Sequence, residues 1–131
     1  MPPPEEMYLQ QRALLWEFVR YDSHSEPVVD RPVEIWVRWN NTQSDMMDAN
    51  GNKVTVDATV KSSREIAVDS IMWEGGFDDI AGTGTGSDQV PESDLMQVKM
   101  VQESKDLRGI VTGRQYGLMF FRNTMPEIVD G

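Results

Sequence analysis

The sequence contains no cysteine and only one histidine. Without cysteine there is no disulfide framework, no thiolate nucleophile, no zinc ribbon and no thiolate-bound cluster. No stretch approaches the roughly 20 consecutive apolar residues that a membrane-spanning helix needs. The first residues lack the basic start and apolar run of a signal peptide, so we expect synthesis in the cytoplasm and no membrane partner.

Basic residues are also scarce. There are 12 lysines and arginines against 22 aspartates and glutamates, which gives a formal net charge of −10. Affinity for nucleic acid comes largely from neutralising phosphates, so this balance opposes tight wrapping of DNA or RNA. A negative wall still suits a channel through which a duplex must slide without sticking.

The residues that could form a catalytic, phosphate-binding or calcium-binding site are explained more simply as parts of loops and turns. His24 lies in the polar run 22–26, where residues adjacent in sequence rarely converge as a Ser/His/Asp triad. The glycine run at 82–86 lacks the Gly-Lys-Ser/Thr ending of a phosphate loop. An EF-hand centred on Gly51 would put Met46 at its first ligand position. We therefore expect no catalytic residue, no cofactor and no metal site, and a protein that is not an enzyme.

Short stretches of alternating polarity predict an all-β fold. The clearest is 33–39, with Val33, Ile35, Val37 and Trp39 on one face. Further strands are expected over 12–21, 43–47, 54–60, 95–101 and 114–122, with an Asn-Gly turn closing a hairpin between 43–47 and 54–60. The segment 66–73 is expected to be one short strand or two half-strands broken near Asp69-Ser70. The polar segment 22–31 is expected to be a turn, and 123–131 a flexible tail. About six to seven short antiparallel strands without a long amphipathic helix favour a small β-barrel or sandwich over 12–122.

One long connection, 74–94, is rich in glycine and has no lysine or arginine. A loop of this length inside a compact domain is usually functional. Its six carboxylates are therefore candidates for facing a channel lumen or a neighbouring subunit. They belong to Glu74, Asp78, Asp79, Asp88, Glu92 and Asp94.

The other candidate interface residues lie in the N-terminal arm and on one strand. Residues 1–11 hold Pro2, Pro3, Pro4 and Tyr8, and a proline run of this kind predicts an extended arm that gains order by docking. Trp36 shares its strand face with charged neighbours, which makes it either an interface residue or one covered by the chain's own arm or loop. The other three tryptophans are expected in the core: Trp16, Trp39 and Trp73.

Several short motifs follow one another along 12–122. They are Leu14-Leu15-Trp16-Glu17, Pro32-Val33-Glu34-Ile35, Arg38-Trp39, Asp48-Ala49-Asn50-Gly51-Asn52, Asp57-Ala58-Thr59-Val60 and Ile71-Met72-Trp73. In this order they resemble the small head–tail joining proteins of tailed bacteriophages, also called head-completion, neck or stopper proteins. The proline arm and the long acidic loop depart from that pattern.

The resemblance implies a structural virion protein at the head–tail interface. It would be a β-barrel subunit of a homo-oligomeric ring of six or twelve copies below the portal or adaptor. The ring would close the filled head and dock the tail terminator or tail tube, while DNA passes through its lumen without sequence-specific binding. Other readings remain open: a tail terminator or another connector component, a monomeric barrel that binds a peptide or ligand through Trp36, and a hydrolase using the acidic loop and a metal.

Overall fold

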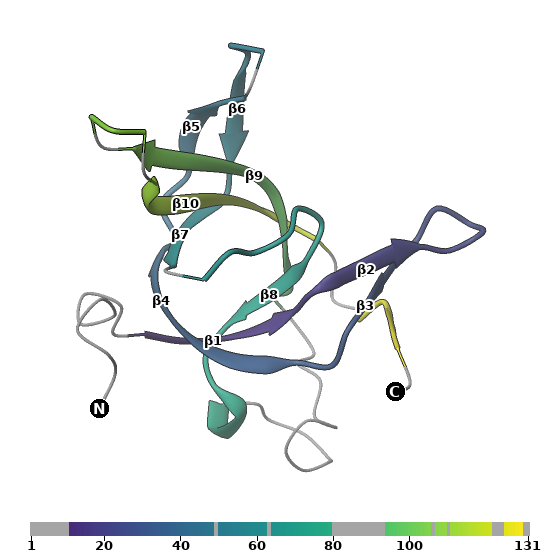
Figure 1. Ribbon diagram of the computed structural model, residues 1–131. Helices are drawn as coiled ribbons and strands as arrows, with labels where there is room; N and C mark the ends of the chain where they lie inside the picture. Colours follow the sequence, from purple (N-terminus) through teal and green to yellow (C-terminus); the bar gives the residue numbers. More distant parts are fainter. Residues whose placement is uncertain are drawn as a thin grey trace.

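The computed structural model describes residues 11–48, 50–62, 64–79, 94–105, 107–109, 111–121 and 125–129. The described residues form strands and one 3-10 turn, with no α-helix among them. The elements are β1 (Gln11–Trp16), β2 (Phe18–Tyr21), β3 (Pro27–Val29), β4 (Val33–Asn40), β5 (Ser44–Met47), β6 (Lys53–Val56), β7 (Ala58–Ser62), β8 (Ile71–Glu74), η2 (Phe77–Asp79), β9 (Met96–Lys105), β10 (Val111–Phe120) and β11 (Glu127–Ile128). The expected all-β class is confirmed, and the architecture is a barrel (Figure 1).

The barrel closes through β1. Its strand order is β1-β4-β7-β10-β9-β8, with antiparallel pairing throughout. One edge of β1 pairs with β4, where Ala13 lies opposite Ile35. The other edge pairs with β8, where Ala13 lies opposite Glu74. Residues 13–15 of β1 are paired on both edges, so closure leaves no exposed edge along them.

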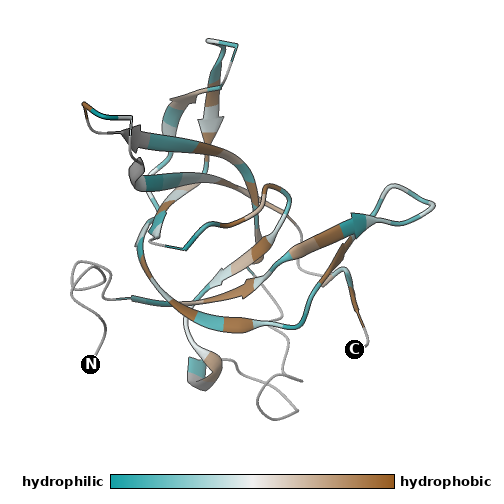
Figure 2. Cartoon of the chain, in the orientation of Figure 1, coloured by the Kyte–Doolittle hydropathy of each residue, from teal (hydrophilic) through white to brown (hydrophobic). Residues whose placement is uncertain are grey.

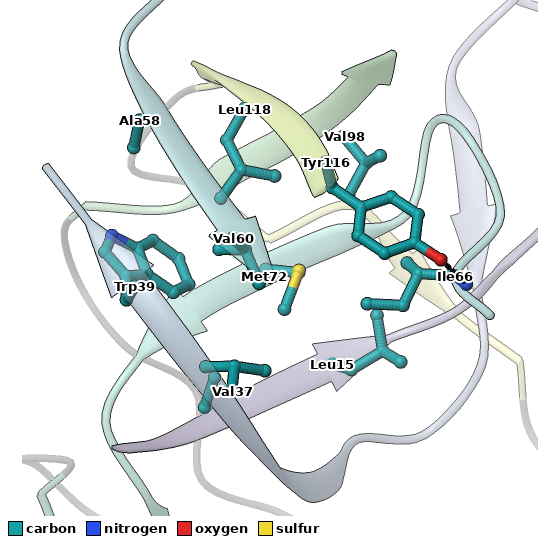
Figure 3. Close-up of a cluster of buried hydrophobic side chains, with 11 residues drawn as sticks. Leu15, Val37, Trp39, Ala58, Val60, Ile66, Met72, Val98, Tyr116 and Leu118 are labelled. Carbon is teal, nitrogen blue, oxygen red and sulfur yellow. Dashed lines mark hydrogen bonds between the residues drawn. The ribbon is translucent and has the colours of Figure 1, made fainter. Parts of the chain in front are cut away.

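The barrel interior is filled by side chains that alternate inward along its strands (Figure 3). This interior core consists of Ala13, Leu15, Val37, Trp39, Ala58, Val60, Ile66, Met72, Val98, Tyr116 and Leu118. Tyr116 is completely buried, and its hydroxyl accepts a hydrogen bond from the Ile66 amide (2.8 Å) and donates one to the Arg64 carbonyl (3.1 Å). The polar end of this large side chain is therefore satisfied inside the core.

A second core lies outside the barrel wall. Leu14 and Trp16 point outward from β1 and are nevertheless fully buried, because they belong to a cluster that also contains Val29 of β3 and, partly buried, Ile128 of β11. These two strands belong to a three-stranded sheet of order β11-β3-β2. The buried members of this outer core are Leu14, Trp16, Val29, Ile71 and Leu95. In Figure 2 much of the brown, hydrophobic colour falls on β1, β2, β3 and β8, where barrel and sheet meet.

A third apolar cluster holds the β5–β6 hairpin against the outer face of the barrel. Met46 and Val56 from the hairpin pack with Met100 of β9. The expected hairpin is confirmed, with Met46 opposite Val54. Gly117 of β10 lies beneath it, and a Cβ at that position would come within 2.8 Å of Met46 Sδ and Val56 Cγ1. The absent side chain is what allows the hairpin to approach this closely.

Two predicted strands are each broken in two where the chain changes sheet. The strand predicted over 12–21 divides at Glu17 into β1 of the barrel and β2 of the outer sheet. At this break the Phe18 amide donates to Ser70 Oγ (2.9 Å). The strand predicted over 54–60 divides at Asp57, whose amide donates to the Leu118 carbonyl (2.8 Å) as the chain passes from hairpin to barrel. The alternation of 54–60 continues across Asp57, and the apolar run of 12–21 resumes after Glu17, so the sequence pattern alone did not reveal either break.

Two short strands were not predicted. β3 lies in the segment expected to be a turn, and β11 lies in the expected tail, where it pairs in parallel with β3. Both are too short to show a period, and Pro27 weakens the strand signal further. In the segment 66–73 only Ile71 onward is a strand, while Ile66 reaches the interior core from an irregular stretch. Val33, expected on the inward face, is 38% exposed because it lies at the strand end.

Replacing Gly117 by alanine should destabilise the fold, because Val56 Cγ1 is held on a stiff side chain and cannot move aside freely. We expect the free energy of unfolding in urea to fall by about 1–3 kcal/mol, the usual range for overpacking. Gly113→Ala on the same strand is the matched control, because nothing lies within 4 Å of its added Cβ. Equal effects of the two variants would contradict this account of Gly117.

Tyr116→Phe should lower the free energy of unfolding at neutral pH by about 1–3 kcal/mol, because the Ile66 amide is left without its acceptor. Burial raises the pKa of Tyr116. The folded protein thus holds this proton more tightly than the unfolded chain, so stability is retained below the ordinary tyrosine pKa of about 10 and lost above it. Urea titrations across that pH range should show a smaller loss in Tyr116→Phe than in the native chain. The same loss of stability with pH in Tyr116→Phe and in the native chain would contradict this account of Tyr116.

Candidate functional site

The structure describes only part of the predicted interface set. Trp36 lies on β4 and is 40% exposed, so its predicted outward position is confirmed. Glu74 ends β8, Asp79 lies in η2, and Asp94 precedes β9; all three are exposed. The backbone of Asp78 belongs to η2. The other predicted interface residues lie outside the described residues. They are Pro2, Pro3, Pro4, Tyr8, Asp88 and Glu92.

The acidic segment 74–94 connects two neighbouring barrel strands. In the antiparallel pair β8–β9, Met72 lies opposite Met96. Glu74 and Asp94 each lie two residues beyond that pair, so both ends of the segment leave the barrel together at the same end of β8 and β9. Asp94 adopts a left-handed backbone conformation (φ 64°), and Leu95, which follows it, is fully buried in the outer core.

Glu34 fixes the start of the acidic segment to the barrel wall. One carboxylate oxygen forms a salt bridge with Arg12 Nη1 (3.4 Å), and the other accepts a hydrogen bond from the Phe77 amide (3.0 Å). A Cβ on Gly76 would lie 2.8 Å from Glu34 Oε2, which shows how closely the chain passes over this carboxylate. The Gly75 amide donates to the Arg12 carbonyl (3.0 Å), which ties the same turn to β1.

A second set of contacts ties Glu74 to β4. Trp39 Nε1 donates to Asn41 Oδ1 (2.8 Å), and Asn41 Nδ2 donates to Glu74 Oε1 (2.8 Å). Together with Glu34, these bonds hold residues 74–77 against β1 and β4. The beginning of the acidic segment is therefore an ordered part of the barrel surface.

Trp36 lies beside this anchored turn. Its cross-strand neighbour is Arg12, and its neighbours on the outward face of β4 are Glu34 and Arg38. Arg38 in turn lies directly opposite Lys61 of β7. An exposed tryptophan with cations on one side and the anchored acidic turn on the other is an arrangement typical of a recognition surface.

The lone histidine does not form a catalytic arrangement with its neighbours. His24 is exposed in the turn between β2 and β3, and its Nδ1 lies 3.4 Å from Ser23 Oγ. The Asp22 carboxylate instead accepts hydrogen bonds from the backbone amides of Glu26 (3.0 Å) and His24 (2.7 Å), and these bonds lower its pKa. Asp22 thus caps a turn. Across the described ranges, no three histidine, aspartate or glutamate side chains gather in a group that could hold a metal ion.

Sequence reasoning missed a polar junction around Asp69. Its carboxylate accepts a hydrogen bond from the Tyr21 hydroxyl, which raises the pKa of Tyr21, and lies 3.5 Å from Lys99 Nζ. These residues come from β2, an irregular turn and β9, so no local pattern could have joined them. Arg12 with Glu34, and Arg38 with Lys61, were missed for the same reason: each pair depends on strand register.

Glu34→Ala should release the turn at 75–77 without unfolding the barrel. Hydrogen exchange at the Phe77 amide should become faster, while the free energy of unfolding falls by less than about 1 kcal/mol because the Arg12 pair is partly exposed. Glu17→Ala is the matched control, since it removes a carboxylate paired elsewhere with Arg64 (2.8 Å). Equal exchange at Phe77 in both variants would mean that Glu34 does not anchor the turn.

In the part of the chain that the structure describes, no helix is long and apolar enough to cross a membrane. No family model, curated protein or solved structure matches this chain. A function for this chain is therefore inferred from its surface geometry and its charge.

Proposed function

We propose that this protein is a structural, non-enzymatic subunit of the head–tail connector of a tailed bacteriophage. In this role it forms a ring below the portal or adaptor, closes the DNA-filled head and docks the tail terminator or tail tube. The ring holds six or twelve copies at the head–tail interface of the virion. DNA passes through its lumen without sequence-specific contacts.

The observation that carries this proposal is the distribution of exposed apolar side chains. Met47 is 60% exposed at the end of β5, and Leu107 is fully exposed in the β9–β10 turn. Tyr21 is 49% exposed on β2, and Trp36 is 40% exposed on β4. In Figure 1 the β5–β6 hairpin, the β9–β10 turn and the β2–β3 hairpin extend from the barrel in different directions. A subunit with neighbours on several sides needs apolar contacts of this kind on several elements.

Charge supports the same role. The net charge of −10 disfavours adhesion to DNA, which suits a channel wall. Both ends of the acidic segment 74–94 leave one end of the barrel together, so its carboxylates can face either the lumen or a neighbouring copy. Repulsion from a lumen wall keeps DNA mobile, whereas contact with a neighbour would seal the ring.

The exposure of Trp36 favours one second candidate from another class, a monomeric barrel that binds a peptide or small ligand. Such a module stays monomeric at all concentrations, both alone and with portal or adaptor rings. A connector subunit forms rings on its own or on those partners. Mass photometry of the chain alone, and of the chain mixed with portal or adaptor rings, distinguishes the two candidates.

A stop codon introduced early in this gene, within the phage genome that carries it, should yield DNA-filled heads and free tails instead of joined particles. The reason is that a connector ring is the only physical link between the two structures at that stage. Electron microscopy of lysates measures the ratio of joined to separate particles, and expression of the chain from a plasmid is the control that restores joining. Normal numbers of joined, infectious particles that lack the protein would overturn the proposal.

A further inference from the structure

Two cations lie directly opposite each other on the outer face of the barrel. Arg38 of β4 is the register partner of Lys61 of β7. Arg38 stands between the buried residues Val37 and Trp39, so its side chain points away from the interior, and both cations are exposed. Like charges at directly opposed positions of antiparallel strands destabilise the pairing. The fold therefore tolerates an unfavourable contact at this position.

Among the described residues, no salt bridge engages Arg38 or Lys61. The salt bridges among described residues engage five other cations, which are Arg12, Lys53, Arg64, Lys99 and Arg114. Trp36 lies two residues before Arg38 on the same outward face. We name Trp36, Arg38 and Lys61 the β4–β7 patch. It is a positive, partly aromatic surface on a strongly acidic protein.

We propose that the β4–β7 patch binds the carboxylate-bearing surface of a second copy of this chain. Charge complementarity argues for this occupant, because with 22 acidic and 12 basic residues another copy carries more carboxylates than cations. Trp36 supplies the kind of large side chain that carries much of the energy of protein interfaces. This inference rests on the proposed function and deepens it by assigning one of the contacts between copies.

The charge of the patch also sets the symmetry of the contact. Two copies of the patch repel each other, so it cannot face itself across a two-fold axis. The contact must join two different surfaces of the chain. A contact of that kind repeats from one copy to the next and closes into a ring when the rotation allows.

The experiment compares two double variants of equal charge. Arg38→Gln/Lys61→Gln removes the patch cations, and Arg20→Gln/Arg31→Gln removes two exposed cations on and near the β2–β3 sheet. Sedimentation velocity over a range of concentrations measures self-association of the full chain, and thermal unfolding measures the stability of the protomer. Trp36→Ser is a third variant that tests the patch without changing its charge.

The native chain should self-associate as its concentration rises. The patch variant should weaken association at least tenfold while leaving the melting temperature of the protomer unchanged or higher, because the opposed like charges are gone. The Arg20/Arg31 variant should associate like the native chain. The Trp36→Ser variant should associate more weakly than the native chain and the Arg20/Arg31 variant. A purely structural role for the cations would instead lower the melting temperature.

A native chain that stays monomeric, a patch variant that associates normally, or equal weakening in both double variants would each overturn the inference. Binding of duplex DNA that the patch variant loses, with self-association unchanged, would overturn it in favour of nucleic acid. The outcome is separable from that of the proposed function. If association depends on the patch but the virions lack the protein, then the proposed function fails and the interface stands.

Discussion

The structure depends on a single strand that is buried on both faces and paired on both edges. Ala13 and Leu15 of β1 fill the barrel interior, while Leu14 and Trp16 fill the core outside the wall. β1 also closes the barrel by pairing with β4 and β8. Burying both faces costs one polar contact: among the described residues Trp16 Nε1 has no hydrogen-bond partner, a loss of about 1–3 kcal/mol. The burial of the indole and of its neighbours in two cores must offset that loss.

After β1 the chain leaves the barrel at Glu17 and enters the outer sheet, whose strands β3 and β11 contribute Val29 and Ile128 to the outer core. Polar contacts around Ser70 and Asp69 fix this departure. Ser70 Oγ accepts from the Phe18 amide at the first residue of β2, and the Asp69 amide donates to the Val98 carbonyl of β9 (2.7 Å). Asp69 adopts a left-handed backbone conformation (φ 76°) to make this turn. The outer sheet is thereby held to the barrel at the point where the chain crosses between them.

Features with a local signal were predictable from the sequence. Alternation over 33–39 predicted β4 and the outward position of Trp36, and the Asn-Gly turn predicted the β5–β6 hairpin. Trp16 and Trp39 are buried as expected, and Trp73 packs against the outer core. The apolar run of β1 indicated a strand, but a run without alternation does not say which core each residue enters. The sheet changes at Glu17 and Asp57 could not be predicted, since they are decided by partners far along the chain.

The candidate site was less predictable than the fold for the same physical reason. The acidic residues of 74–94 could be recognised by composition, but the anchor of that segment could not, because Glu34 lies more than 40 residues from Phe77 (3.0 Å between carboxylate and amide). The opposition of Arg38 and Lys61 depends on the register between β4 and β7. A pattern within one strand carries no information on the residue that the next strand places opposite.

The two cores explain why the protein can keep unfavourable surface features. Burial of β1, β3 and the interior side chains stabilises the protomer enough to carry an opposed cation pair and several exposed apolar side chains. In this protein they lie on separate strands and turns that extend from the barrel. That distribution supports the proposed role of a subunit with neighbours on several sides.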